Sequence, residues 1–214
     1  GEIEVNDKIK MGLKYHGVYQ EDIPRKEIKE IEKFLLDKIN KLNKSEGLTD
    51  NNKYKLVICG SYRRKKPKSG DIDVLISKVG TTKKSKDVGD HLKKIIHILK
   101  KKWKKNNGQK LLVDDLTDPE VSPTKYMGFL KWKNNPPRRI DIRFIPYDSF
   151  YTALLYFTGS GEFNKVMRNI AKDKGYKLSE YGLFKISNNE KMMIKSEKDV
   201  FDVLGMDYLE PKLR

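Results

Sequence analysis

The chain has 214 residues with 46 Lys or Arg against 30 Asp or Glu, which gives a formal net charge of +16 at pH 7. No apolar run approaches the ~20 residues of a membrane span, and the single cysteine, Cys59, cannot form an internal disulfide. A membrane protein and a secreted disulfide scaffold are therefore disfavoured, and the charge makes a polyanion the first partner to consider.

Residues 24–145 are expected to begin with a helix and then to consist mainly of short strands, with one further helix among them. Residues 24–42 predict a helix, because Pro24 suits an N-terminal helical position and apolar side chains recur at helical spacing. The densest basic cluster, Lys93 to Lys105, also has apolar residues at this spacing, so we expect a helix with one basic and one buried face. Short apolar runs predict strands at 54–59, 72–77, 111–113, 126–132 and 139–145.

The C-terminal part has a different pattern. From Ser149 onward it is helical, with a break at 159–161, a second helix to about Lys174 and a hairpin-like tail. We therefore expect an α+β fold. A domain with a mixed β-sheet and flanking helices, 11–147, would precede a smaller α+β domain, 148–214.

Two carboxylates stand together at the start of the second expected strand. Asp71 and Asp73 follow the turn 69–70, and strand alternation places both on one face with Ile72 on the other. Paired oxygen ligands beside a glycine turn can hold Mg²⁺ and leave positions for water and phosphate. The turn 60–61 upstream offers backbone N–H groups and a hydroxyl to an anion, so the two motifs together predict a metal and phosphate site.

A third carboxylate lies in the last expected strand. The period of two places Arg139, Asp141 and Arg143 on one face of it. If this strand neighbours the one that carries Asp71 and Asp73, three carboxylates converge, which is enough to clamp two divalent metals for in-line phosphoryl chemistry. A surface ladder of ion pairs is the simpler alternative for the same pattern.

Five ordered motifs span most of the chain. They are Gly60-Ser61-Tyr62-Arg63-Arg64, Ser69-Gly70-Asp71-Ile72-Asp73-Val74-Leu75, Thr124-Lys125-Tyr126-Met127-Gly128, Arg138-Arg139-Ile140-Asp141-Ile142-Arg143 and Tyr156-Phe157-Thr158-Gly159-Ser160. In this order and at these separations, the chain closely resembles the family X DNA polymerases, the DNA polymerase β-like repair enzymes. The resemblance implies a nucleotidyltransferase palm at 11–147 and a thumb at 148–214.

The resemblance also implies a role for each matching position. The catalytic residues, and the ligands of two Mg²⁺ ions that Mn²⁺ can replace, would be Asp71, Asp73 and Asp141. The nucleotide-binding positions would be Gly60, Ser61, Arg64, Ser69, Gly70, Tyr156, Phe157, Thr158, Gly159 and Asn164. The DNA-binding positions would be Lys125, Arg139, Arg168 and Tyr181.

The implied activity is template-directed addition of deoxynucleotides to the 3′-OH of a DNA primer, with gap filling in base excision repair as the expected process. The partners would be primer–template or gapped DNA and dNTPs, without a membrane, and the chain would act as a monomer. Residues 1–10 match at most the end of a fingers region and Gly1 is not Met, so we expect palm and thumb only, with the lyase and fingers domains missing. Residues 181–185 resemble the short family members that large DNA viruses encode. The expected location is intracellular, in the nucleus, or in the cytoplasm if the source is such a virus.

Other functions stay open at this point. A template-independent terminal transferase or an RNA-tailing nucleotidyltransferase would share the Gly-Ser turn and the acidic pair, although the aromatic motif 156–159 argues against RNA tailing. A DNA-binding module without catalysis would fit the charge, but three carboxylates argue against it, because acid aimed at phosphate repels it. Asp22 and Gly161 depart from the family pattern, which has a basic and an acidic residue there.

Overall fold

The computed structural model describes residues 7–17, 21–118 and 120–214. Of the leading segment 1–10, residues 1–6 lie outside the described residues. The helix α1 (Asp7–Lys14) comes first. Tyr15, directly after α1, stacks on Phe129 with 3.9 Å between the ring centroids, which docks the start of the chain onto the central sheet.

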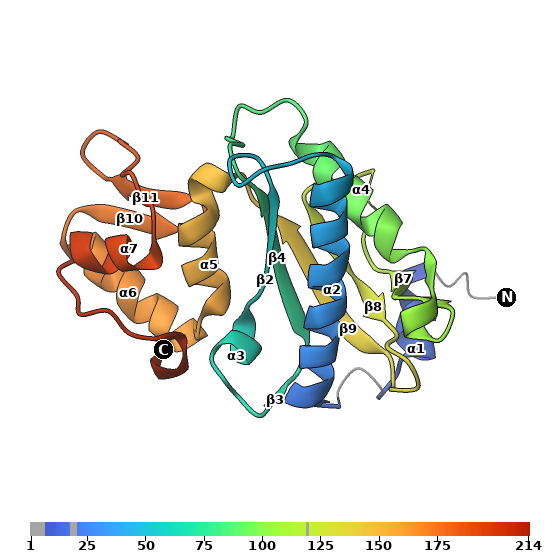
Figure 1. The fold of residues 1–214 in the computed structure, drawn as a ribbon. Coiled ribbons are helices and arrows are strands. Elements are labelled where there is room, and N and C mark those ends of the chain that lie inside the picture. Colours follow the sequence, from blue (N-terminus) through green and yellow to red (C-terminus); the bar gives the residue numbers. More distant parts are fainter. Residues whose placement is uncertain (1–6, 18–20, 119) are drawn as a thin grey trace, which may run out of the picture.

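Five strands form one mixed sheet in the larger part of the molecule (Figure 1). In spatial order they are β2 (Tyr54–Ile58), β4 (Ile72–Lys78), β9 (Arg138–Phe144), β8 (Lys125–Leu130) and β7 (Leu112–Asp115). Within this sheet β4 and β9 run parallel, and the other neighbours are antiparallel. The expected mixed sheet is confirmed, and its parallel pair joins segments that lie far apart in the sequence.

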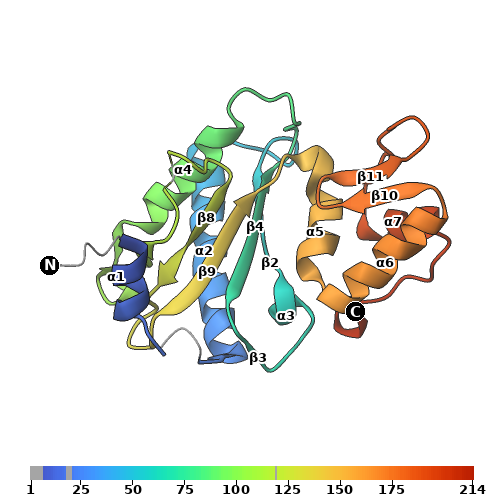
Figure 2. The ribbon, with the colours of Figure 1, turned by 180° about the vertical axis from the view of Figure 1, so that it is seen from behind.

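Two helices, α2 (Arg25–Ser45) and α4 (Val88–Leu99), cover one face of this sheet (Figure 1, Figure 2). Their apolar stripes share a core with even-numbered strand residues such as Val74 and Ile142. Since side chains alternate along a strand, the odd-numbered residues of β4 and β9 lie on the opposite face. Asp73 and Asp141 therefore project from the face opposite α2 and α4.

The smaller C-terminal part has a core of its own. Its elements are α5 (Phe150–Thr158), α6 (Gly161–Asp173), the antiparallel hairpin of β10 (Tyr176–Ser179) and β11 (Gly182–Lys185), and α7 (Glu197–Val203). Phe201 and Leu183 are fully buried there. The α5 helix lies between the two parts (Figure 1), where Phe150 packs with Cys59 and Leu75 from the second face of the sheet.

Short elements complete the described chain. They are β1 (Ile23–Pro24), α3 (Gly60–Arg63), β3 (Lys68–Ser69), β5 (Lys102–Trp103), β6 (Gln109–Lys110) and the 3-10 turns η1 (Lys104–Asn106), η2 (Tyr147–Ser149) and η3 (Pro211–Leu213). The pairs β1–β3 and β5–β6 each form a small antiparallel ribbon.

The expected α+β class, the five strands, the break at 159–161 and the hairpin are confirmed, with strand ends that move by a residue or two. The helix expected to carry the lysines from Lys93 to Lys105 is too long, because α4 ends at Leu99. The indole Nε1 of Trp103 donates to the carbonyl of Ile98 at 2.9 Å, and the backbone N–H of Leu111 donates to that of Leu99 at 3.1 Å. The carbonyls of Ile98 and Leu99, which would accept backbone N–H groups in a longer helix, accept these hydrogen bonds instead.

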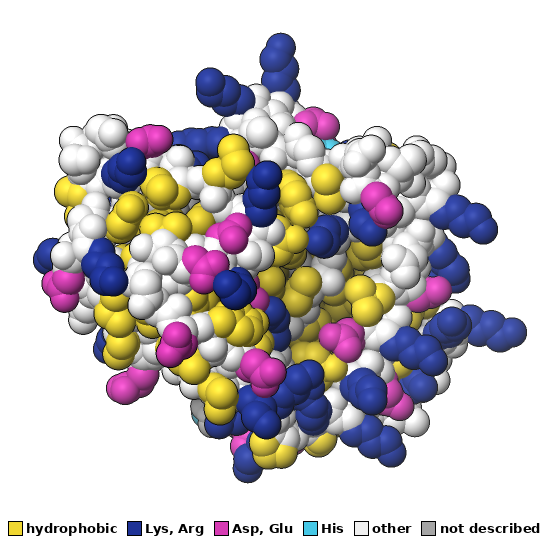
Figure 3. All heavy atoms as spheres, turned by 60° about the vertical axis from the view of Figure 1, so that its left-hand side comes forward, with side chains coloured by type: hydrophobic (Ala, Val, Ile, Leu, Met, Phe, Trp, Pro, Cys, Tyr) yellow, Lys and Arg dark blue, Asp and Glu magenta, His cyan; other side chains and the backbone are white. Residues whose placement is uncertain are grey.

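No helix in the described part of the chain is both long and apolar enough to cross a bilayer. Positive charge is spread widely over the surface. Figure 3 shows Lys and Arg side chains on many parts of one face, with Asp and Glu among them. Net charge alone therefore does not locate a binding site.

Candidate active site

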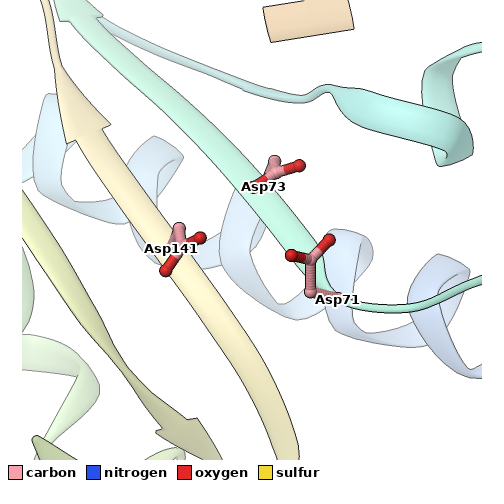
Figure 4. A group of neighbouring side chains, drawn as sticks. All are labelled: Asp71, Asp73 and Asp141. Carbon is pink, nitrogen blue, oxygen red and sulfur yellow. The ribbon is translucent and has the colours of Figure 1, made fainter. Parts of the chain in front are cut away.

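Three carboxylates meet on the face of the sheet opposite α2 and α4. Asp71 precedes β4, Asp73 lies on it, and Asp141 stands directly opposite Asp73 in the parallel pairing with β9. One oxygen from each lies within 4.8 Å of the others. Figure 4 shows the three side chains gathered from two neighbouring strands. The two strands are neighbours, so the condition for the three carboxylates to converge is met.

Burial and the neighbouring negative charges raise the pKa of two of these carboxyl groups. Burial, followed by the charges of Asp71 and Asp141, raises the pKa of Asp73 to about 7. Burial and the charge of Asp141 also raise the pKa of Asp71. Arg139 supplies a counter-charge, because its Nη2 donates to Oδ1 of Asp141 at 2.9 Å. A donor set of three carboxylate oxygens this close together fits a hard divalent cation.

The Gly60-Ser61 turn lies directly against this cluster. Gly60 has a φ of +60°, and a Cβ at this position would lie 2.9 Å from Oδ2 of Asp73, so close an approach requires glycine. The backbone N–H of Cys59 donates to the carbonyl of Asp73 at 2.8 Å, which holds α3 beside β4. Ser61 Oγ donates to Ser69 Oγ at 2.6 Å. The turn and the acidic pair are thus one structural unit.

Two further expected residues meet at the end of α5. Arg64 Nη1 donates to the carbonyl of Thr158 at 2.7 Å, while its buried Nε has no hydrogen-bond partner among the described residues. Gly159 follows with a φ of +70°, and a Cβ there would lie 3.2 Å from Arg64 Nη1. Gly70, in contrast, has open space around it. The hydrogen bond from Arg64 to Thr158 therefore connects the Gly60-Ser61 turn to the C-terminal part.

The aromatic pair on α5 faces two directions. Phe157 lies near the carboxylates, lining a small hollow with Asp73 and Asp141, and the guanidinium of Arg143 lies 4.8 Å from its ring centroid. Tyr156 is perpendicular to Phe157. It lines another hollow together with Asn164 and Arg168. Asn164 Nδ2 donates to the carbonyl of Tyr156 at 2.8 Å, so α5 and α6 are joined at this point.

The expected DNA-binding residues are not all brought together. Arg139 lies at the carboxylates, and its Nη1 also donates to the carbonyl of Gly128. Arg168 is exposed on α6, and Tyr181 is exposed in the β10–β11 turn. Lys125 begins β8, where it stands opposite Arg143 of β9, two residues from the position that faces Asp141.

One functional connection is missed by the sequence analysis. Arg63 donates from Nη2 to Oε1 of Glu197 at 2.6 Å and from Nη1 to Oγ1 of Thr158 at 2.8 Å. Arg214 donates to Oε2 of Glu197 at 2.5 Å. Ser196 and Asp199 signal the start of α7, since the Ser196 hydroxyl accepts from the Asp199 N–H. No local pattern indicates that Glu197 pairs with an arginine from the other part of the chain.

Comparison with known proteins gives a consistent result. The family description DNA polymerase beta palm matches residues 22–147, and DNA polymerase beta thumb matches residues 153–214. The chain is 35% identical over 218 residues to DNA polymerase lambda of Rattus norvegicus, covering 95% of this chain and 35% of that protein. It is 30% identical over 222 residues to DNA polymerase lambda of Arabidopsis thaliana, covering 96% and 39%. The chain thus spans little more than a third of these relatives.

A solved structure is similar across the whole chain. The crystal structure of Leishmania infantum polymerase beta in a ternary P/T complex superimposes with a TM-score of 0.81 and 32% sequence identity, covering 100% of this chain and 84% of that one. The fold, the acidic cluster and the two matched regions agree with one another. The chain therefore belongs to the DNA polymerase β family, the family X polymerases, and carries the palm and thumb.

Proposed function

We propose that this chain adds deoxynucleotides to the 3′-OH of a DNA primer under the direction of a template, as in the filling of short gaps during repair. The observation that carries the proposal is the cluster of Asp71, Asp73 and Asp141, held by the parallel register of β4 and β9. The family of the chain supports it. Phosphoryl transfer depends mainly on positioning and electrostatics, which a rigid sheet provides.

The three carboxylates would hold two divalent cations, Mg²⁺ in the first place and Mn²⁺ as a substitute. When bound, such ions supply positive charge that stabilises the attacking and leaving oxygens of an in-line displacement. Asp71 and Asp73 lie beside each other and would contribute to both ions, whereas Asp141 would hold the one nearer the primer. Arg139 fixes the orientation of the Asp141 carboxylate through their hydrogen bond.

The turn beside the cluster would receive the triphosphate. Ser61 offers a hydroxyl, Gly70 leaves room, and Arg64 retains an Nε without a partner in the described residues. An anionic group brought to Arg64 gains a hydrogen bond that the protein alone does not provide. Gly60 and Ser69 keep this turn against β4 and would shape the same pocket.

The start of the thumb would contact the rest of the nucleotide. Phe157 lines a hollow together with Asp73 and Asp141. We propose that Tyr156, Phe157, Thr158 and Gly159, at and after the end of α5, pack on the sugar and exclude a 2′-hydroxyl. Asn164 joins them through its hydrogen bond to Tyr156. The proposed DNA contacts are Lys125, Arg139, Arg168 and Tyr181.

Primer extension on DNA with a one-nucleotide gap tests this function. Each dNTP and each NTP is offered separately, with Mg²⁺ or Mn²⁺, on substrates with and without a template strand. Insertion of the complementary dNTP on gapped DNA supports the proposal. Extension that ignores the template indicates a terminal transferase, extension of RNA indicates a tailing enzyme, and DNA binding without extension indicates a module that lacks catalysis.

A further inference from the structure

A groove outside the candidate active site lies on the helix-covered side of the sheet. It opens between α2, η1 and the connection that follows β8, and its volume is about 490 Å³. Two nearly buried aromatic rings, Phe34 and Trp132, give it an apolar lining. Its charged lining consists of Lys33, Lys105, Lys133, Glu30 and Asp37.

The walls of this groove are held by a buried amide. Asn106 is fully buried and donates from Nδ2 to the carbonyl of Lys131 at 2.9 Å. Its Oδ1 accepts the backbone N–H of Lys133 at 2.6 Å, and Gln109 Nε2 donates to the carbonyl of Lys133 at 2.8 Å. Lys133 is thereby fixed with a φ of +52°. The groove is therefore preformed, which lowers the ordering cost of binding.

The acidic residues of the groove are already engaged. Asp37 pairs with Lys41 at 3.1 Å and with Lys38 at 3.4 Å. Glu30 accepts a hydrogen bond from the Trp132 indole at 3.3 Å. The three lysines that line the groove, in contrast, form no ion pair within the described residues. Positive charge is thus in excess at the groove.

Free lysines also gather next to it. In the cluster that begins on α4, the lysines nearest the helix are neutralised: Lys93 pairs with Glu120, Lys94 with Glu46 and Lys100 with Asp115. Beyond the end of α4 the situation changes. No ion pair within the parts of the chain that the structure describes involves Lys101, Lys102, Lys104 or Lys105. Unneutralised charge therefore concentrates at the end of the cluster that borders the groove.

The groove and the three carboxylates lie on opposite faces of the sheet. Phe34 belongs to α2, which packs on one face, whereas Asp73 and Asp141 project from the other. A strand whose end reaches the carboxylates does not enter the groove without passing round the edge of the sheet. A ligand in the groove would therefore be separate from the primer end and the nucleotide at the three carboxylates.

We propose that this groove binds the backbone of single-stranded DNA, as a second nucleic-acid site beyond the proposed polymerase site. Phosphates would contact Lys33, Lys105 and Lys133, in the manner of the positively charged grooves that track a single-stranded backbone. Phe34 and Trp132 are 3% and 4% exposed and form the apolar wall behind these lysines. The groove has the volume of a small-ligand pocket, so it accepts one strand and not a duplex. Flanking lysines extend the path for further phosphates.

Tryptophan fluorescence reports on this groove directly. The chain has two tryptophans. Trp132 lines the groove, and Trp103 lies beside it, with its ring centroid 6.3 Å from that of Phe34. We expect a saturable change in emission when a short oligothymidylate is added to the 214-residue chain without metal or nucleotide. The measurement needs no catalysis, so its outcome is independent of the polymerase proposal.

A matched pair of variants tests the assignment. Lys33→Gln with Lys105→Gln removes two groove charges, whereas Lys83→Gln with Lys84→Gln removes two exposed charges at the other end of α4. For single strands, each phosphate contact contributes about 0.7 to the steepness with which log affinity falls against log salt concentration. The groove variant lacks two contacts, so its slope should be shallower by about 1.4. Between 1 M and 0.1 M salt, its affinity should therefore rise about 25-fold less than that of the wild type. The control should keep the slope and the emission change.

Three results would overturn the proposal. The first is an absence of any emission change with oligothymidylate. The second is an equal loss in both double variants, which would mean that net charge alone attracts DNA. The third is a change produced by oligouridylate, an acidic peptide or anionic vesicles at concentrations where oligothymidylate has no effect. All residues exchanged are exposed, so both variants retain the fold.

Discussion

Asp73 and Asp141 stand opposite each other on two parallel strands whose sequences lie far apart. Like charges at paired positions oppose the pairing of the strands, and the pKa of Asp73 rises to about 7 by burial and by the charges of Asp71 and Asp141. The apolar core under β4 and β9 and the ladder of backbone hydrogen bonds therefore hold the carboxylates together. The site is therefore preorganised for a cation, and the repulsion between its carboxylates lowers the stability of the fold without metal.

Replacing Asp141 by Asn should separate chemistry from binding. Nucleotide addition should fall by at least about 10²- to 10³-fold, because one preorganised charge of the proposed site is lost, while affinity for primer–template stays within about twofold. Single-turnover extension and fluorescence anisotropy measure the two effects. The control is Asp118→Asn, which removes the same charge at an exposed position elsewhere. Parallel loss of extension and DNA binding would show that Asp141 is structural.

Gly60→Ala tests the contact between the turn and Asp73. The new Cβ would lie 2.9 Å from Oδ2 of Asp73 and must displace that carboxylate. Gly47→Ala is a matched control, because Gly47 also has a positive φ, +64°, but nothing lies near its Cβ position. Both variants should lose about 1 to 2 kcal/mol of folding stability, because a Cβ is strained at a positive φ. Only Gly60→Ala should weaken Mn²⁺ binding, measured by calorimetry; equal metal affinity in both variants would contradict the proposed crowding.

The strands and the acidic cluster could be predicted because their signals are local. Period-two alternation sorts Asp71, Asp73 and Asp141 onto one face, and Gly and Pro mark the strand ends. That the two strands are neighbours was a condition of the sequence argument, since alternation says nothing about which strands pair. The structure supplies this pairing through the core that β4 and β9 share with α2 and α4.

Features that depend on distant contacts were not predictable. The helix with the lysine cluster ends early because Trp103 and Leu111 satisfy its last carbonyls, and neither contact has a signal in the helix itself. The sequence pattern predicts only a hairpin-like tail where the structure also has α7. The contact from Arg63 to Glu197 crosses from the sheet to the C-terminal part, and charged residues are too frequent in this chain for their partners to be inferred from the sequence.

Divalent cations should stabilise the folded chain. A ligand that binds only the native state at ten times its Kd contributes about 1.4 kcal/mol, which is about 3 to 5 °C in Tm for a domain of this size. We expect this rise with Mg²⁺ or Mn²⁺ in thermal unfolding followed by circular dichroism. The shift should disappear in Asp73→Asn and persist in Asp118→Asn. A cation effect that is equal in the two variants would place the metal elsewhere.

Tyr156→Ala should relax the choice of sugar. If this ring excludes a 2′-hydroxyl, its removal lowers the preference for dNTPs over NTPs by about tenfold, a typical value for loss of steric exclusion in a pocket. Single-nucleotide insertion with dNTP and NTP in competition gives the ratio. Tyr156→Phe retains the ring and its packing against Phe157, so it should keep the wild-type preference. Unchanged discrimination in the alanine variant would remove Tyr156 from the sugar contact.

Glu197 should make the connection between palm and thumb sensitive to acid. Burial acts to raise the pKa of Glu197, but hydrogen bonds from Arg63 and Arg214 outweigh it and hold the pKa below its ordinary value of 4.5. A carboxyl group with a lowered folded-state pKa contributes stability above the unfolded value, and this contribution is lost as pH falls through the folded value. The wild type should therefore lose stability steeply below about pH 4.5.

Glu197→Gln isolates this contribution. At pH 7 the variant should lose about 3 kcal/mol of unfolding free energy, because Arg63 and Arg214 keep their positions in the interior without a counter-charge. Urea unfolding between pH 7 and pH 3.5 should show a smaller decline for this variant than for the wild type, so that the two curves converge in acid. Glu210→Gln, at an exposed position near the C-terminus, should follow the wild type throughout. Parallel curves for Glu197→Gln and the wild type would mean that the paired carboxylate does not govern the acid response, and that other groups unfold the chain at low pH.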